Sequence, residues 1–180
     1  MLRITIPKRE FFDEANDAFI TVKEQTLQLE HSLVSLSRWE SKWHKPFLSR
    51  DHRTAEESLD YVRCMTITQN VNPLIYSGID NKLFEEIKNY IDEPMTATWF
   101  NQKTGGAGNQ RIVTAELIYY WMFSMGIPLE CEKWHLNRLL TLIKVHDAEN
   151  SPKKKMSKSE IYAQNKALNA ARLKAMGVKG

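Results

Sequence analysis

Cysteine, glycine and long apolar runs are all scarce in this chain of 180 residues. Its two cysteines, Cys64 and Cys131, form no CxxC pair, so the sequence predicts no disulfide scaffold and favours a reducing compartment. No apolar run reaches the ~18 residues that span a bilayer. The opening residues, MLRITIPKRE, lack the apolar stretch of a signal peptide. We therefore expect a cytosolic protein without a membrane segment.

Three of the seven glycines cluster in the segment from Thr104 to Asn109 (TGGAGN). A phosphate-binding loop needs a Lys followed by Ser or Thr after its glycines, and the dinucleotide fingerprint GxGxxG needs a preceding apolar strand. Neither pattern occurs here. The cluster predicts a surface loop, and we expect no cofactor.

Residues suited to metal binding or catalysis are few and scattered. Cys131 and His135 have ligand-like spacing on one helix face, but a second pair, such as Cys64 with His52, would have to converge from elsewhere. Glu132 with His135 does not make the HExxH motif of metalloproteases. Neither cysteine has the local signature of a nucleophile. The sequence thus predicts no catalytic residue, no metal site and no enzymatic activity.

Charge is distributed unevenly along the chain. Residues 151–180 hold eight Lys or Arg against the single acid Glu160, a local charge of +7, so residues 1–150 sum to −4 within the net charge of +3. A basic arm on an acidic body indicates an acidic partner or a solubilising terminus. We expect a compact domain over 1–150 and a basic tail over 151–180.

The first 31 residues favour β structure. Leu2, Ile4 and Ile6 alternate with polar residues, as in a half-buried strand. Residues 19–22 and 26–30 are short enough and rich enough in β-forming residues to pair with it. The pattern predicts a small antiparallel meander.

Helical signals follow the meander. The segment from Ser32 places Leu36, Trp39 and Trp43 on one face and ends before Pro46. Further helices are predicted from the capping box of Thr54 and Glu57 to about Met65, and over residues 82–91.

The longest apolar stretch predicts a helical hairpin. Thr114 can cap a helix in which residues 117–123 are consecutively apolar, Gly126 and Pro128 break it, and a second helix is predicted from Leu129 to His146. The second helix exposes few polar residues for base edges, which favours a structural hairpin over a DNA-reading helix-turn-helix. The fold class is therefore mainly α (α+β): a helical bundle with a central antiparallel hairpin.

The basic tail has its own helix signals. Ser157 and Glu160 form a capping box, and residues 158–176 carry a thin apolar side. Such a helix is marginal alone and suited to ordering on a partner. The predicted partner-binding residues supply charge and apolar contact, and are Lys153, Lys154, Lys155, Lys158, Ile161 and Leu168.

Four segments carry a family resemblance: LQLEHSLVSLSRWESKWHKPFL (27–48), IVTAELIYY (112–120), ECEKWHLNRLLTLIKV (130–145) and KKKMSKSEIYAQNKALNAAR (153–172). They resemble small proteins from the structural genes of long-tailed bacteriophages, in particular the tail assembly chaperones. The resemblance implies a protein of the host cell cytoplasm without catalytic activity. Its implied partners are the tape measure protein, which it keeps soluble, and the tail tube proteins that assemble around it.

Two other functions fit the same residues. A virion structural protein, such as a head-tail connector or tail component, would use residues 151–180 as an arm that reaches a neighbour. A nucleic-acid-binding protein would use the Lys153–Lys158 cluster on phosphates, without sequence readout and with strong salt dependence. Tyr162 is the only aromatic residue beside that cluster, which is little for base stacking. Homo-oligomerisation is compatible with all three functions.

Overall fold

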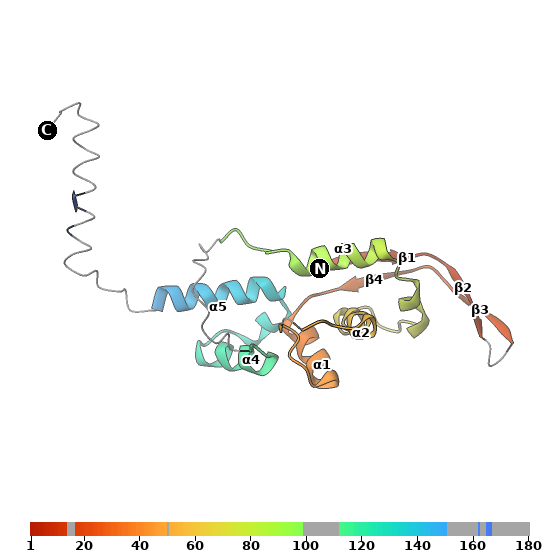
Figure 1. The fold of residues 1–180 in the computed structure, drawn as a ribbon, viewed down its shortest axis with the longest axis horizontal. Helices are drawn as coiled ribbons and strands as arrows, with labels where there is room; N and C mark the ends of the chain where they lie inside the picture. The colour runs from red at the N-terminus through yellow and green to blue at the C-terminus, as the bar shows by residue number, and fades with distance from the viewer. Residues whose placement is uncertain (14–16, 50, 99–111, 151–161, 163–164, 167–180) are drawn as a thin grey trace, which may run out of the picture. The chain divides into compact units, whose positions relative to one another are not determined.

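A computed structural model describes the chain except residues 14–16, 50, 99–111, 151–161, 163–164 and 167–180 (Figure 1). The chain divides into two compact units, Met1–His146 and Asp147–Gly180. In the second unit Tyr162, Asn165 and Lys166 are helical and exposed. The fold mixes helices with antiparallel strands, as predicted. Among the helices of the described residues, none is long and apolar enough to cross a membrane.

The N-terminal strands form one long hairpin instead of the predicted meander. β1 (Leu2–Ile6) pairs with β4 (Gln25–Leu29), and β2 (Arg9–Asp13), which the sequence did not predict, pairs with β3 (Ala18–Val22). In both ladders the two residue numbers of each pair have the same sum. The β2–β3 ladder therefore continues the register of the β1–β4 ladder. They are separated at Pro7, which has no N–H to donate to a ladder.

The free edge of β4 pairs with a segment that is distant in sequence. The N–H of Ile67 donates to the carbonyl of Gln28 at 2.8 Å, and the N–H of Glu30 donates to that of Met65 at 2.9 Å. Residues just after the second helix therefore extend the β1–β4 sheet on its other side. This long-range pairing fixes the hairpin to the helical body.

Two capped helices follow. α1 (Leu33–Trp43) begins at Ser32, and α2 (Ala55–Met65) begins at the capping box of Thr54 and Glu57, both as predicted. The two helices are joined by both indoles of α1: Trp39 donates to the carbonyl of Glu57 at 2.8 Å and Trp43 to the carboxylate of Asp60 at 2.9 Å. A buried indole N–H needs such a partner.

A short 3-10 helix, η1 (Pro73–Gly78), precedes α3 (Asn81–Asp92), which matches its predicted range closely. Asp80 caps α3 by accepting the N–H of Leu83 at 2.9 Å. α3 lies along β1 and buries Ile87 and Tyr90 (Figure 1). η1 in turn packs against the hairpin near Ile6.

The predicted helix from Leu129 to His146 is broken in the structure. Its first part is a 3-10 helix, η2 (Leu129–Lys133), and its second is α5 (Leu136–Asn150). Between them His135 forms an antiparallel bridge with Ser32, and the N–H of Leu136 donates to the carbonyl of His31 at 2.7 Å. This bridge to the end of the hairpin prevents a continuous helix.

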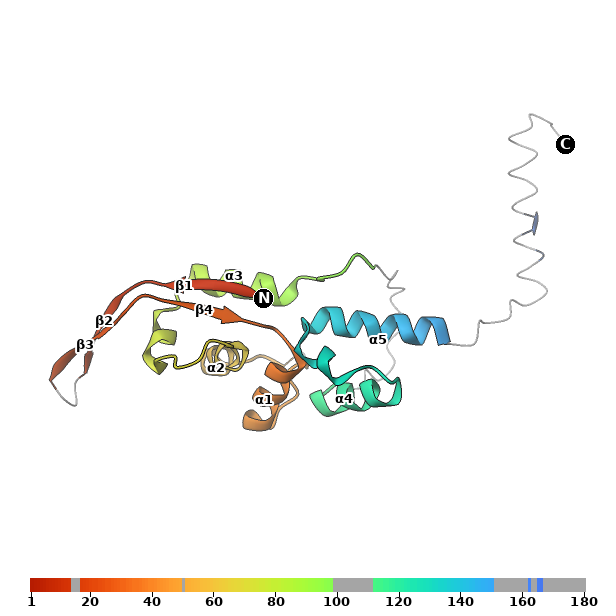
Figure 2. The same cartoon turned by 180° about the vertical axis from the view of Figure 1, so that it is seen from behind.

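α4 (Ala115–Ser124) is also not enclosed on all sides, although residues 117–123 are apolar. It buries Ala115, Ile118 and Met122, whereas Tyr120 and Phe123 are 65% and 67% exposed. Its main neighbour is α1, which also contacts α2 and η2 (Figure 2). α1 therefore lies among three other helices, and the structure does not confirm the central position predicted for the hairpin.

Strands and helices share one core. Its fully buried side chains come from the β1–β4 sheet and from the described helices of the first unit other than η2, and the largest are Trp39, Ile6, Leu27, Leu29, Leu33, Leu36, Met65, Ile75, Ile87, Ile118, Met122 and Leu136. A continuous core of this kind fixes the relative positions of the surfaces described below.

Candidate functional site

The residues predicted to bind a partner, Lys153, Lys154, Lys155, Lys158, Ile161 and Leu168, lie outside the described residues. Tyr162, between the last two, is 73% exposed. The structure therefore leaves the tail site as a prediction. Candidate sites in the body are an apolar surface, a cleft and a buried polar network.

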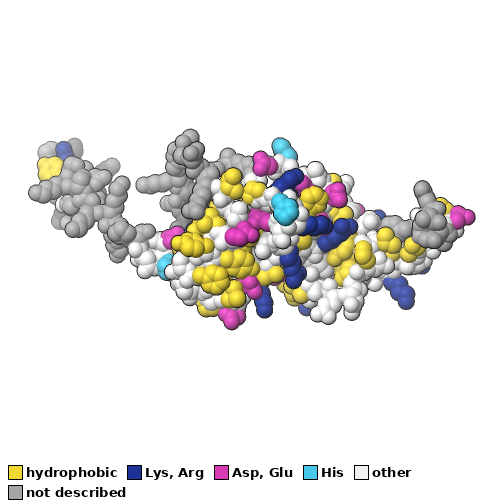
Figure 3. Space-filling view, turned by 90° about the horizontal axis from the view of Figure 1, so that it is seen from below, with side chains coloured by type: hydrophobic (Ala, Val, Ile, Leu, Met, Phe, Trp, Pro, Cys, Tyr) yellow, Lys and Arg dark blue, Asp and Glu magenta, His cyan; other side chains and the backbone are white. Residues whose placement is uncertain are grey.

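The apolar surface lies on α4 and its flanking residues. Tyr120 and Phe123 of the helix are joined by Ile112, which is 62% exposed, and Leu129, which is 46% exposed. We call these four residues the α4 face. Figure 3 shows hydrophobic side chains gathered over α4. Contiguous apolar surface of this kind commonly marks a site where another protein binds.

Helical periodicity explains which side chains are exposed. Ala115, Ile118 and Met122 recur at intervals of three and four and point into the core. Tyr120 and Phe123 have the same spacing on the other side of the helix. The aromatic run contains more apolar residues than one side of a helix can bury, and this excess was the sequence signal for the exposed face.

Negative charge borders the α4 face. From Ile112 to the end of η2 the acidic side chains are Glu116, Glu130 and Glu132, and the one basic side chain is the exposed Lys133. The hydroxyl of Tyr119 donates to Glu132 at 2.8 Å, which holds η2 against α4. Burial and this carboxylate raise the pKa of Tyr119, so the phenol stays protonated. The surface thus combines exposed aromatic rings with carboxylates.

The start of α4 is held by a carboxylate from α1. Glu40, which is 7% exposed, accepts the N–H of Ala115 at 2.7 Å and that of Phe47 at 2.7 Å. Burial raises the pKa of Glu40, although both N–H groups oppose this shift. The predicted cap Thr114 occupies the N-cap position but makes no capping hydrogen bond. A surface hollow of about 300 Å³ at this junction is lined by Glu40, Ser41, His44, Lys45, Pro46, Thr114 and Glu116.

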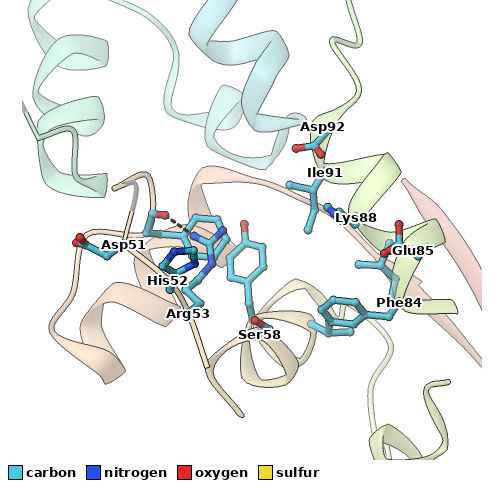
Figure 4. A pocket seen from close by; sticks show the side chains of 13 residues that line it. Asp51, His52, Arg53, Ser58, Phe84, Glu85, Lys88, Ile91 and Asp92 are labelled. Atoms are coloured by element: carbon cyan, nitrogen blue, oxygen red, sulfur yellow. Dashed lines mark hydrogen bonds between the residues drawn. The ribbon is translucent and has the colours of Figure 1, made fainter. Parts of the chain in front are cut away.

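A cleft of about 370 Å³ lies between α2, α3 and the loop after α1 (Figure 4). Asp51, His52 and Arg53 line one side, and Glu85 and Lys88 of α3 line the other. Its walls therefore carry both signs of charge. This mixture does not favour a ligand of one charge.

Side chains of the cleft already have partners within the fold. Arg53 donates to the carbonyl of Phe47 and lies over its ring, with 4.2 Å between guanidinium carbon and ring centroid. Ser58 donates to the carbonyl of Thr54 at 2.9 Å, so its hydroxyl proton is not directed at a catalytic base. Phe47 stacks on Tyr61, with 3.9 Å between ring centroids. These contacts make the cleft wall a structural element of the body.

A buried polar network links the hairpin to the helices. The Nδ1 atom of His31 and the hydroxyl of Tyr61 are 2.6 Å apart, and the rings of His31 and His135 meet edge to face with centroids 5.1 Å apart. His135 Nε2 lies 2.9 Å from the carbonyl of Tyr90, and the hydroxyl of Tyr90 donates to Glu30 at 2.6 Å. The network thus connects the end of β4 with α2, α3 and the residues between η2 and α5.

The fold favours the neutral form of both histidines in this network. Burial, His135 and Arg53 lower the pKa of His31 to about 3. Burial also lowers the pKa of His135. Since only a protonated nitrogen can donate to the Tyr90 carbonyl, His135 carries its proton on Nε2. Two neutral imidazoles with structural partners favour a role in joining elements.

The metal-ligand candidates do not converge. Cys131 is buried in the core, and His135 is occupied by Tyr90. Across the part of the chain that the structure describes, no three His, Cys, Asp or Glu side chains are grouped to hold a metal ion. Cys64 is half-buried, and burial and Asp60 raise its thiol pKa, which disfavours the thiolate that a nucleophile or metal ligand requires.

Comparisons with protein-family models, curated proteins and solved structures find no match for this chain. The site is therefore defined by its own geometry. Of the features described here, the α4 face has the clearest binding chemistry.

Proposed function

We propose that this chain is a non-enzymatic tail assembly chaperone of a long-tailed bacteriophage. It binds the tape measure protein, keeps it soluble in the host cytoplasm and assists the assembly of tail tube proteins around it. The binding is non-covalent and uses no cofactor. The α4 face is its body contact, and the basic tail supplies a second contact.

The observation that carries the proposal is the exposure of Tyr120 and Phe123 on an otherwise well-packed helix. Burying an aromatic side chain is favourable by about 1.5 to 3 kcal/mol, so two exposed rings on a rigid surface are available for a protein contact. Keeping a long helical protein soluble requires covering its apolar stripe. An aromatic face on a compact carrier performs this task.

The arrangement of hydroxyl groups also supports a binding role. Tyr61, Tyr90 and Tyr119 each contact a histidine or carboxylate, and burial raises the pKa of each. These hydroxyls stay protonated and hold elements together. The described contacts of these groups are structural.

A co-purification experiment tests the proposal. The full chain is produced with the neighbouring phage proteins, and retained proteins are identified by mass spectrometry after nuclease treatment. We expect the tape measure protein to be retained. Two variants test the two contacts. One changes Lys153, Lys154, Lys155 and Lys158 to Gln, and the other combines Tyr120→Ala with Phe123→Ala. Both should retain less tape measure protein than the unchanged chain.

The control is Phe19→Ala in β3, where the ring is 73% exposed but distant in sequence from α4. It should retain as much tape measure protein as the unchanged chain. Purified virions should lack the chain, because a chaperone leaves after assembly. Its presence in virions at fixed stoichiometry would instead assign it to the tail or head-tail connector, and loss of all partners on nuclease treatment would indicate nucleic-acid binding.

A further inference from the structure

The shape of the α4 face restricts the kind of partner that can pack against it. Its aromatic residues, Tyr120 and Phe123, are three positions apart on one helix and present a short apolar ridge. Leu129 extends this apolar surface beyond Gly126, which turns the chain with a φ of +65°. A rigid ridge of this kind matches the apolar stripe of an amphipathic helix, whose contacts recur at three- and four-residue intervals.

Carboxylates outnumber basic side chains around the ridge. Glu116 is exposed four positions before Tyr120, and Glu130 is exposed directly after Leu129. Glu132 is brought to the same place by its bond with Tyr119. Carboxylates therefore lie beyond both ends of the aromatic pair.

The basic side chains near the start of α4 do not reverse this charge. His44 and Lys45 line the hollow at the start of α4 together with Glu116. Lys45 is bound to the carboxylate of Glu57 at 2.5 Å, so its charge is balanced within the body. On η2 itself the exposed Lys133 follows Glu132, so the carboxylates outnumber the basic side chains by three to one over residues 112–133.

We infer that the α4 face binds an amphipathic helix whose apolar stripe is bordered by Lys or Arg. This inference rests on the proposed function, because it specifies the chemistry of the helical partner. The apolar stripe covers Tyr120 and Phe123, and the basic borders lie against Glu116 and Glu130. An acidic helix would bring like charges together, which lowers affinity and slows encounter.

Three synthetic helices with the same leucine stripe test the inference. Their borders are Lys, Glu or uncharged Gln, their ends are blocked, and binding to the full chain is followed by fluorescence anisotropy. At about 50 mM salt we expect the Lys-bordered helix to bind at least about tenfold more tightly than the Glu-bordered one. The difference should shrink at about 500 mM salt because exposed charges are screened.

Matched variants locate the contact. Tyr120→Ala with Phe123→Ala should weaken all three helices by about tenfold or more, as expected for aromatic anchors. Glu116→Gln with Glu130→Gln should reduce the preference for Lys borders and leave binding of the Gln-bordered helix unchanged. Controls at a distance are Phe19→Ala for the rings and Glu85→Gln with Glu86→Gln on α3 for the acids. Circular dichroism checks that every variant is folded.

Several results would overturn the inference. One is equal or tighter binding of the Glu-bordered helix, and another is absence of binding by every helix. A third is self-association of the chain that is lost in the Tyr120→Ala and Phe123→Ala variant. That result would assign the α4 face to contact with a second copy of the chain. Retention of the tape measure protein without helix binding would refute only this inference. Helix binding without tape measure retention would refute the proposed function and leave the surface assignment standing.

Discussion

The carboxylate of Glu40 in α1 accepts the backbone N–H of Ala115, the first residue of α4, at 2.7 Å. Its other oxygen accepts the N–H of Phe47 at 2.7 Å, in the loop that follows α1. One buried side chain thus caps a helix that starts far along the sequence and fixes the chain after its own helix. The position of the α4 face depends on this contact.

Glu40→Ala should therefore destabilise the fold and loosen α4. Removing the carboxylate leaves two buried amides without a partner, at a cost of about 1 to 3 kcal/mol each. Loss of a buried charge offsets part of this cost. Urea unfolding gives the change in free energy, and hydrogen exchange at Ala115 reports the local loss.

Thr114→Ala is the matched control for that prediction. A side-chain N-cap usually contributes about 0.5 to 2 kcal/mol, but Thr114 makes no such bond here, so we expect a change near or below the lower limit. A large loss in Thr114→Ala with little change in Glu40→Ala would show that α4 is capped locally.

Stability should fall with acidification because of His31. Its folded pKa of about 3 is below the value of 6.5 for a free imidazole, so the neutral form is the one that the fold stabilises. Its contribution is complete above pH 6.5 and is lost as the pH falls from 6.5 toward 3, at about 1.4 kcal/mol per pH unit. His135 acts in the same direction, since burial lowers its pKa as well.

Urea unfolding between about pH 7.5 and pH 5 measures this slope. His31→Gln should be less stable at neutral pH, because the Tyr61 contact is altered, but should show a shallower dependence on pH. His52→Gln, at an exposed position, should keep the original slope. Equal slopes in all three proteins would show that the fold does not lower the pKa of His31.

Local signals predicted most helices of the body correctly. The Thr54 and Glu57 capping box and the residue spacing in α1 and α3 depend on neighbours in sequence, and each helix begins within a residue or so of its predicted start. Tertiary contacts explain the errors. His135 bridges to Ser32 and interrupts a predicted helix, and Glu40 replaces Thr114 as the cap. α4 exposes rings that the continuous apolar run over residues 117–123 had placed in the core.

The hairpin shows a different limit of sequence analysis. The segment REFFD has no polar and apolar alternation, so β2 was not predicted, and β1 and β3 were assigned to one sheet. Their actual partners follow from a register that runs through the whole ribbon. The exposed aromatic pair of Phe12 and Phe19, with ring centroids 5.2 Å apart, forms only through this register.

Gly78 should not tolerate a side chain. A Cβ atom there would lie 2.7 Å from Cγ2 of the buried Ile6, and such overpacking typically costs about 1 to 3 kcal/mol. Gly78→Ala should thus lower the free energy of unfolding by this amount. Ile6→Ala should be destabilising alone, but the double variant should be more stable than the sum of both losses predicts.

Gly126→Ala separates the effect of space from that of backbone conformation. No atom lies within 4 Å of a Cβ at Gly126, but its φ of +65° disfavours residues other than glycine. We expect a loss of about 1 kcal/mol in the free energy of unfolding that no neighbouring substitution rescues.

The Gly78 prediction has its own contradicting outcome. Additive effects of Gly78→Ala and Ile6→Ala would show that η1 can shift away from the hairpin.

Burial in α5 gives a last prediction about where the core ends. Leu139 is fully buried, whereas its neighbour Leu140 is only partly buried. Leu139→Ala should cost about 2 to 5 kcal/mol, and Leu140→Ala clearly less, because a cavity forms only where packing surrounds the side chain. Thermal and urea unfolding of the two variants compare them directly. Equal losses would mean that the outer side of α5 is covered more fully than its exposure in the structure indicates.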